Sequence, residues 1–177
     1  MRKTKLLTNE QIDQFEKNIY CELFSAAHTN LEGVHQSWNQ VSRGAKKNPD
    51  VVCAYVKQLI HIGHATNEVE DLIRTTLKSK WQPELVMIYG SLPFHDLNRQ
   101  LVIVGAWLKL HGQQPELLFV LGKLCVRVQL WGKAKDYFER CLLLGPNAAA
   151  SLEYGRLMEH LGENEAAMEI YKAGLKV

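Results

Sequence analysis

Apolar residues recur along this chain every three or four positions, in runs that proline and glycine interrupt. That spacing places apolar side chains on one face of an α-helix, whereas no alternating run is long enough for a β-strand. Pro49, Gly63, Pro83, Gly112 and Pro115 mark clear breaks between the runs. The pattern predicts an all-α chain of ten helices, joined by short links into successive antiparallel hairpins. The helices are expected at about 8–28, 31–46, 50–63, 67–80, 83–90, 95–111, 115–129, 132–144, 147–161 and 163–176.

A second pattern, in the size of the side chains, repeats between residues 115–146 and the residues that follow. A shift of 33 positions places residues of comparable kind on one another at nearly every pattern position, and Leu118 on Ser151 is the one poor match. The pattern residues are Leu118, Leu121, Gly122, Cys125, Ala134, Phe138, Cys141 and Pro146 in the first copy, and Tyr154, Gly155, Met158, Ala167, Tyr171 and Gly174 in the second.

Close packing of two helices explains this alternation of small and large residues. A hairpin brings its helices close together only where one helix presents a small residue and the other fills the gap. Gly122 and Ala134 would permit the approach, and Leu121 and Phe138 would fill the space beside it. Each hairpin would leave an apolar face that its neighbour buries, so that the array extends in one direction. The pattern resembles the tetratricopeptide (TPR) family, which implies a right-handed superhelix of about five antiparallel helix hairpins.

Weaker copies of the repeat precede the two good ones. Residues 50–79 form a degenerate copy with Lys57 where glycine is usual, and residues 83–111 form a distorted hairpin with a shortened first helix and Gly90 in the glycine place. The predicted organisation is one continuous solenoid, with an uninformative N-terminal helix at 1–30, degenerate TPR-like hairpins at 31–111 and two well-formed repeats at 115–146 and 148–177.

Three segments carry a more specific resemblance. "WQPELVMIYG" at 81–90, "RQLVIVGAWLKLHGQQPELL" at 99–118 and "LGKLCVRVQLWGKAKDYFE" at 121–139 resemble the C-terminal region of the HemY-type proteins of Gram-negative bacteria. The resemblance covers about residues 31–177. It implies an association with haem (porphyrin) biosynthesis, two membrane-spanning helices ahead of the TPR region, and no defined active site. This chain would then be a soluble fragment of a protein anchored in the bacterial inner membrane, with the cytoplasmic face preferred.

Composition argues against several classes of function. The formal net charge is +2, too small for the strong basic footprint of a nucleic-acid-binding protein. No apolar run is long enough to span a membrane. The four cysteines form no CxxC pair and match no zinc spacing, so we expect reduced thiols. Cys53, Cys125 and Cys141 occupy packing positions of the repeat, where a thiol behaves as a small hydrophobic residue.

Candidate chemistry is sparse. His61 and His64 lie three positions apart, at which two imidazoles on a helix can share a metal ion, but no third ligand is indicated. The competing interpretation is that His64 ends a helix, where its charged form suits the helix dipole. Haem iron could take His, Cys or Tyr as ligand, yet the chain has no Cys-Pro or CxxCH motif. No nucleophile–base pattern is present. We therefore expect no enzyme, no metal site and no resident cofactor, and haem binding stays an alternative.

A binding groove is the favoured functional feature. In a TPR array the first helix of each hairpin lines the concave surface, and Lys123, Arg127 and Arg156 would be fixed cations there. They would hold an acidic or C-terminal peptide segment through charge-assisted hydrogen bonds, with Phe119 and Leu152 giving apolar contact. The alternative is that these cations are solvated charges on an exposed helix face. The expected groove residues are Gln58, His61, Ser91, Phe119, Lys123, Arg127, Leu152, Arg156 and His160.

The expected partners are proteins or peptides, with haem-biosynthesis enzymes implied by the family resemblance and no nucleic acid. A generic TPR adaptor in envelope assembly or secretion, and a haem-binding or haem-handing protein, are the alternatives. The last helix has no capping helix to cover Tyr171 and Leu175, which predicts a homodimer through that helix.

Overall fold

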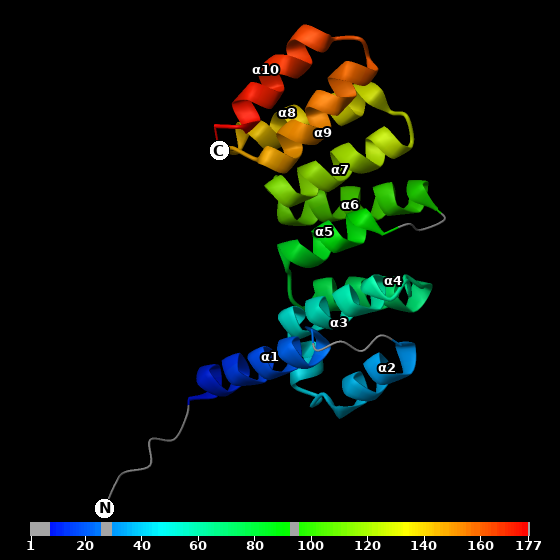
Figure 1. Ribbon diagram of the computed structural model, residues 1–177, viewed down its shortest axis with the longest axis vertical. Coiled ribbons are helices and arrows are strands. Elements are labelled where there is room, and N and C mark those ends of the chain that lie inside the picture. The colour runs from blue at the N-terminus through cyan, green and yellow to red at the C-terminus, as the bar shows by residue number, and fades with distance from the viewer. Residues whose placement is uncertain (1–7, 26–29, 93–95, 177) are drawn as a thin grey trace, which may run out of the picture. The chain divides into compact units, whose positions relative to one another are not determined.

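The computed structural model describes residues 8–25, 30–92 and 96–176, and within those ranges it contains helices and turns but no strand. The predicted all-α class is confirmed (Figure 1). The helices are α1 (Asn9–Ser25), α2 (Leu31–Gln40), α3 (Pro49–His61), α4 (Asn67–Ser79), α5 (Pro83–Ser91), α6 (Leu97–His111), α7 (Pro115–Arg127), α8 (Trp131–Leu143), α9 (Ala148–His160) and α10 (Asn164–Gly174), with a 3₁₀ turn at Ala45–Lys47.

The largest difference from the predicted helices concerns α2, which was expected to reach residue 46. It ends at Gln40 because Val41 takes an extended backbone conformation, with φ −64° and ψ 131°. The next turn of helix is the separate 3₁₀ segment at Ala45–Lys47. Elsewhere the helix ends agree within a few residues, and the expected helical residues 26–28 and 95 lie outside the described ranges.

Two compact units make up the chain, residues 1–85 and residues 86–177. In the second unit, α7 packs on α8 and α9 packs on α10 as two antiparallel hairpins (Figure 1). That the hairpins of the whole chain form one continuous right-handed superhelix stays a prediction.

Two glycines set the closeness of the hairpins in the second unit. A Cβ atom built on Gly122 would lie 2.5 Å from the Phe138 ring, and one built on Gly155 would lie 2.1 Å from the Tyr171 ring. Both distances are far shorter than carbon atoms tolerate, so each aromatic ring lies directly on glycine backbone. The two contacts are 33 residues apart in the sequence, which is the repeat that the side-chain sizes predicted.

The pattern residues of the two good repeats fall into three groups by exposure. Two are partly covered, Tyr171 and Gly174, and Pro146 is exposed in the link between hairpins. The buried ones are Leu118, Leu121, Gly122, Cys125, Ala134, Phe138, Cys141, Tyr154, Gly155, Met158 and Ala167.

The hairpin of α5 and α6 departs from the repeat through its register. α5 has nine residues where α7 has 13. Val102 follows Gly90 by the same 12 positions that separate Ala134 from Gly122, yet Val102 is 72% exposed. α6 instead buries Gln100, whose side-chain Nε2 donates to the backbone oxygen of Tyr89 at 2.9 Å. In this hairpin the buried face of α6 therefore begins two residues earlier than the spacing of the good repeats would place it.

In the first unit, α3 is the central helix and contacts α1, α2 and α4. The Trp38 and Tyr55 rings stack with centroids 4.1 Å apart, and Phe24 of α1 lies against Tyr55 at 5.4 Å. Lys57, which stands where the good repeats have glycine, is exposed and pairs with Glu84 instead of admitting a ring. The degenerate repeat thus lacks the close helix crossing of the second unit.

Polar contacts attach α1 to the rest of this unit. Lys17 Nζ lies 2.8 Å from Asp50 Oδ2, and Gln82 Nε2 donates to Asp50 Oδ1 at 2.6 Å. The hydrogen bond to Asp50 raises the pKa of Lys17. Because Asp50 lies in the first turn of α3, a single carboxylate joins α1, α3 and the segment before α5.

Substitution of Gly122 by alanine tests the glycine–aromatic contact. We expect Gly122→Ala to lower the free energy of unfolding by about 1–3 kcal/mol, since overpacking outweighs the gain in helix propensity. Chemical denaturation followed by circular dichroism measures the change.

Gly105→Ala is the matched control, because Gly105 is also helical and nothing lies within 4 Å of an added Cβ. It should stabilise the chain by about 0.5–1 kcal/mol. Phe138→Leu in the Gly122→Ala background should recover part of the loss, since the ring is the clashing group. A Gly122→Ala chain as stable as Gly105→Ala would disprove the contact.

Candidate functional site

α7 and α9 lie next to each other in the second unit (Figure 1). On each of them the expected groove residues are four positions apart, a spacing that places them on one face of the helix. Pro115 starts α7, and the Asn147 side chain caps α9 by accepting from the backbone N–H of Ala150 at 2.9 Å. Because each start is fixed, the direction of the later side chains on both helices is fixed too. We call the set Lys123, Arg127, Leu152, Arg156 and His160 the α7–α9 face.

Phe119 was expected to offer apolar contact to a peptide, and its burial corrects that expectation. Its side chain is only 6% exposed, and its ring lies 6.3 Å from the Phe138 ring in the core. Lys123 Nζ lies over the Phe119 ring, 5.5 Å from the centroid. Phe119 therefore positions Lys123 through a cation–π contact and does not itself form a binding surface. Leu152 is 44% exposed and so offers an apolar surface.

The cations of the α7–α9 face differ in what holds them. Arg127 is exposed and its Nη1 donates to the backbone oxygen of Leu92 at 3.4 Å. Among the described residues, neither Lys123 nor Arg127 has a carboxylate within ion-pair distance. Arg156 is paired with Glu153 at 3.2 Å, one turn away on its own helix. Two of the three cations therefore have no carboxylate partner among the described residues, and the third is paired within its own helix.

α9 is held in its orientation by two tyrosine hydroxyls. Tyr154 donates to Glu139 of α8 at 2.7 Å, and Tyr171 of α10 donates to Glu159 at 3.0 Å. Burial and the nearby carboxylate raise the pKa of Tyr154, so its hydroxyl stays protonated and donating. His160 rests against Trp131, with ring centroids 4.7 Å apart. Sequence reasoning missed this last contact, because it joins two hairpins across 29 positions.

The other expected groove residues are less well placed. Ser91 is exposed, but its hydroxyl donates to the backbone oxygen of Ile88 in its own helix at 2.8 Å. Gln58 is half-buried and His61 is exposed, and both belong to α3 in the first unit.

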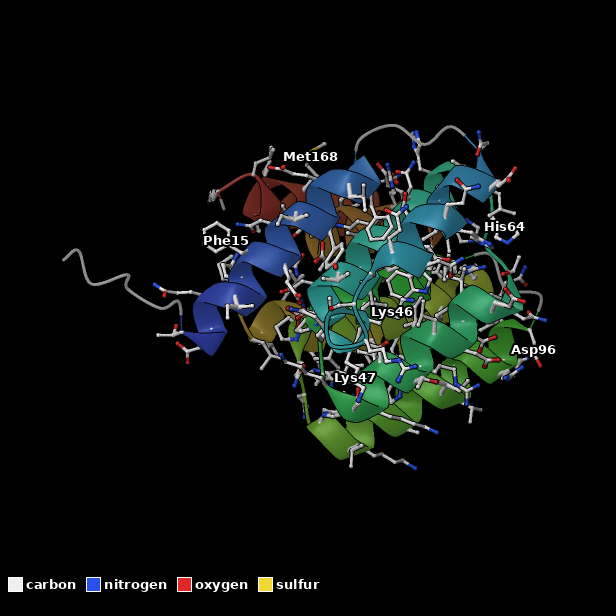
Figure 2. The ribbon with its side chains drawn as sticks, turned by 90° about the horizontal axis from the view of Figure 1, so that it is seen from below. Phe15, Lys46, Lys47, His64, Asp96 and Met168 are labelled. Carbon is white, nitrogen blue, oxygen red and sulfur yellow. The ribbon has the colours of Figure 1, made fainter. Side chains whose placement is uncertain are left out.

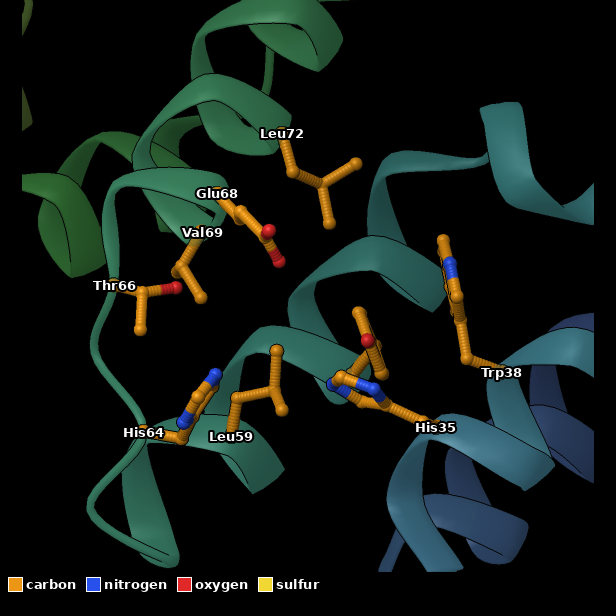
Figure 3. Close-up of a pocket in the computed structure, with 9 residues that line it drawn as sticks. His35, Trp38, Leu59, His64, Thr66, Glu68, Val69 and Leu72 are labelled. Carbon is orange, nitrogen blue, oxygen red and sulfur yellow. The ribbon is translucent and has the colours of Figure 1, made fainter. Parts of the chain in front are cut away.

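A pocket of about 270 Å³ lies between α2, α3 and α4 in the first unit. Figure 3 shows His35 and His64 on one side of it, with the side chains of Thr66 and Glu68 directed toward its middle. The two imidazole centroids are 6.1 Å apart, and Thr66 Oγ1 is buried without a hydrogen-bond partner. These groups could hydrogen-bond one small polar molecule.

The sequence suggested His61 and His64 as a pair, but the structure brings His64 together with His35 instead. His64 lies beside His35 on the same side of the pocket, while His61 is exposed on α3. His35 and Trp38 lie three positions apart in the expected helix 31–46, which was the available signal for a shared face. In the part of the chain that the structure describes, no three His, Cys, Asp or Glu side chains are arranged to hold a metal ion.

The thiols show no sign of a catalytic role. Cys53, Cys125 and Cys141 are buried and unpaired. Burial raises the pKa of Cys53 to about 12 and the pKa of Cys125 and of Cys141 to about 11. Cys141 Sγ donates to the backbone oxygen of Pro115 at 3.3 Å. These thiols are therefore packing residues that stay protonated at neutral pH.

A search for membrane-spanning helices finds none within the described ranges. No protein-family model matches the sequence, and no curated protein matches it either.

Solved structures do match the fold. The thermophilic TPR protein TTC0263 of Thermus thermophilus is 12% identical, with a TM-score of 0.68 over 93% of this chain and 90% of that one. This chain has the tetratricopeptide-repeat fold. MamA of Desulfovibrio magneticus superposes with a TM-score of 0.61 at 12% identity, over 93% of both chains. PilF of Pseudomonas aeruginosa gives 0.62 at 17% identity, over 93% of this chain and 77% of that one.

Thiol modification tests the burial of the TPR packing cysteines. At pH 8 a thiol with a pKa of about 11 is ionised in only about one molecule in 1,000, and the thiolate is the reactive form. We expect an aromatic disulfide reagent to modify at most Cys21 in the native chain and all four thiols after denaturation. Fast reaction of Cys125 or Cys141 in the native chain, located by peptide mass spectrometry, would contradict their packing.

Proposed function

We propose that this chain is a non-catalytic protein-interaction scaffold that binds an acidic or C-terminal peptide segment on its α7–α9 face. The observation that carries the proposal is the pair Lys123 and Arg127. They lie one turn apart on a rigid helix, held by an aromatic ring and a backbone oxygen, and no carboxylate of the described chain neutralises them.

The neighbouring residues suit a peptide carboxylate. Lys123 and Arg127 would bind it through charge-assisted hydrogen bonds, and the guanidinium of Arg127 can engage both oxygens. Arg156 would exchange Glu153 for the ligand at little net cost, because the existing pair is exposed. Leu152 supplies an apolar contact beside the charges. A side chain of Glu or Asp, or a terminal carboxylate, next to an apolar residue fits this arrangement.

We assign the scaffold to haem biosynthesis at the bacterial inner membrane, with haem-pathway enzymes as partners. This assignment rests on the resemblance of segments 81–90, 99–118 and 121–139 to HemY-type proteins. An anchor ahead of the chain would concentrate the scaffold and its partners at the membrane. The cytoplasmic face is preferred because Cys53, Cys125 and Cys141 are unpaired thiols.

The size of the histidine-lined pocket argues against haem transfer by this chain. The histidine-lined pocket of the first unit measures about 270 Å³, below the roughly 300–1,000 Å³ of ordinary small-molecule sites. A porphyrin would not enter it without displacement of the stacked Trp38 and Tyr55 rings. We expect micromolar haem to leave the Soret band unshifted, and a shift abolished by His64→Ala would favour the haem-handing alternative.

Charge reversal on α7 tests the peptide site. With a fluorescein-labelled pentaglutamate peptide as probe, Lys123→Glu with Arg127→Glu should weaken binding at least about 10-fold, the loss of one charged hydrogen bond or more. Fluorescence anisotropy measures it, and binding should weaken with added salt.

Lys109→Glu with Lys133→Glu is the control, because both lysines are exposed on other helices and the net charge changes equally. The control should bind as the parent does. Equal loss in the two variants would mean that only net charge matters, and unchanged binding by the α7 variant would move the site elsewhere. Circular dichroism should show the same helicity for all three proteins.

The partner is identified by photo-crosslinking from position 160 on the α7–α9 face, in cells that make the full-length protein. Haem-pathway enzymes among the crosslinked proteins, lost in the Lys123→Glu and Arg127→Glu background, would support the assignment. Outer-membrane or secretion components would replace it with the general adaptor alternative and leave the peptide site intact.

A further inference from the structure

An apolar pocket of about 430 Å³ lies at the hairpin of α9 and α10, and we call it the C-terminal pocket. It is formed between the first turns of α9 and the last residues of α10. Leu175 is 84% exposed and Leu152 is 44% exposed, so the apolar lining is open. The lining residues are Ala148, Ser151, Leu152, Tyr171, Gly174 and Leu175.

The preceding repeat shows which kind of element covers the equivalent surface. A shift of 33 positions carries Tyr171 to Phe138 and Leu152 to Phe119, in the hairpin of α7 and α8. There α9 lies on the surface, and Tyr154 stacks on Phe138 with ring centroids 6.1 Å apart. Phe138 is fully buried and Phe119 is 6% exposed as a result. The C-terminal pocket therefore has the form of a seat for a helix that presents an aromatic ring.

α1 carries a matching apolar stripe that no other described element covers. Ile12, Phe15 and Ile19 are 43%, 58% and 59% exposed. They span two turns on one side of α1, while Phe24 on the other side is buried against Tyr55. Figure 2 shows Phe15 directed away from the neighbouring helices. We call these three residues the α1 stripe, and its central aromatic ring corresponds to Tyr154 between the buried Ala150 and Leu157 of α9.

Charge also favours this pairing. Residues 9–25 contain three glutamates and one aspartate against the single lysine Lys17. Lys172 and Lys176 flank the lining residues of the C-terminal pocket at the end of α10. Lys172 is paired with Glu169 at 2.8 Å, an exposed contact within its own helix that an incoming carboxylate can replace. An acidic helix with an apolar stripe thus faces an apolar seat with a basic rim.

We propose that the C-terminal pocket binds α1 of a second copy of this chain, with Phe15 on Tyr171. The contact joins two different surfaces, so it is heterologous, and it leads to a chain of copies or to a closed ring. Three apolar side chains and a few exposed charges make a small interface, with a dissociation constant of about 1–100 µM. The proposal needs neither Lys123 nor Arg127, and it shares only Leu152 with the proposed peptide site.

Sedimentation velocity from 1 to 200 µM tests the association with three surface variants. Phe15→Glu with Ile19→Glu removes the α1 stripe, and Ala148→Glu with Leu175→Glu blocks the C-terminal pocket. All four side chains are exposed, and a glutamate at 148 suits the start of α9, so both variants should fold. Leu110→Glu with Leu143→Glu is the control, because these leucines are 76% and 83% exposed outside both surfaces.

The wild type and the control should associate with rising concentration, and each test variant should stay monomeric at 200 µM. A mixture of the stripe variant and the pocket variant should form a 1:1 heterodimer, since each retains one intact half of the contact. A photo-crosslinker at position 15 should reach 148–152 or 171–175 of the other, isotope-labelled copy.

Three outcomes would overturn the proposal. A monomeric wild type at 200 µM excludes self-association through these surfaces. Association of the stripe variant alone would mean a pocket-to-pocket contact, and association of the pocket variant alone would mean a stripe-to-stripe contact. Failure of the mixture to form a heterodimer contradicts the heterologous pairing. Pentaglutamate binding is measured on the same samples, so loss of the peptide site is seen separately.

Discussion

The contact between glycine backbone and an aromatic ring determines the form of the second unit. Gly122 and Gly155 have no Cβ, and the rings of Phe138 and Tyr171 occupy the space where one would be. This sets the distance between the two helices of each hairpin, and hence the direction in which the next helix can pack. Tyr154 then stacks on Phe138, so one contact positions the next along the array. This order brings the first helices α7 and α9 side by side, as the proposed α7–α9 face requires.

The sequence could predict this part because the constraint is local. A hairpin brings together residues about 16 positions apart, and the sizes of the side chains at both ends are visible in the sequence. The register of α6 could not be predicted, because the buried Gln100 amide bonds a backbone oxygen rather than filling a size-matched gap. The end of α2 at Val41 comes three residues before the nearest glycine, Gly44, so only the backbone angles of Val41 fix its position.

The candidate site was predictable only in part, for a related reason. Helical spacing is sufficient to place Lys123, Arg127 and Arg156 on the first helices, but spacing cannot tell an exposed position from a buried one. Phe119 shows this, since its ring is covered by neighbours that no local pattern describes. Spacing places His35 and Trp38 on one face of α2. The contact between His35 and His64 also depends on how α2 meets α3, and a single sequence carries no signal for that.

Lys57 in the glycine place has a consequence for the dynamics of the first unit. No aromatic ring packs on residue 57 in the α3–α4 hairpin. The Lys57 side chain instead forms an ion pair with the exposed Glu84, which lies outside that hairpin. In a repeat protein, stability is a sum of intrinsic and nearest-neighbour terms, and a repeat with weak terms opens locally before the others. Amide hydrogens of α4 should accordingly exchange with solvent through a low-energy opening that leaves α7 to α10 closed.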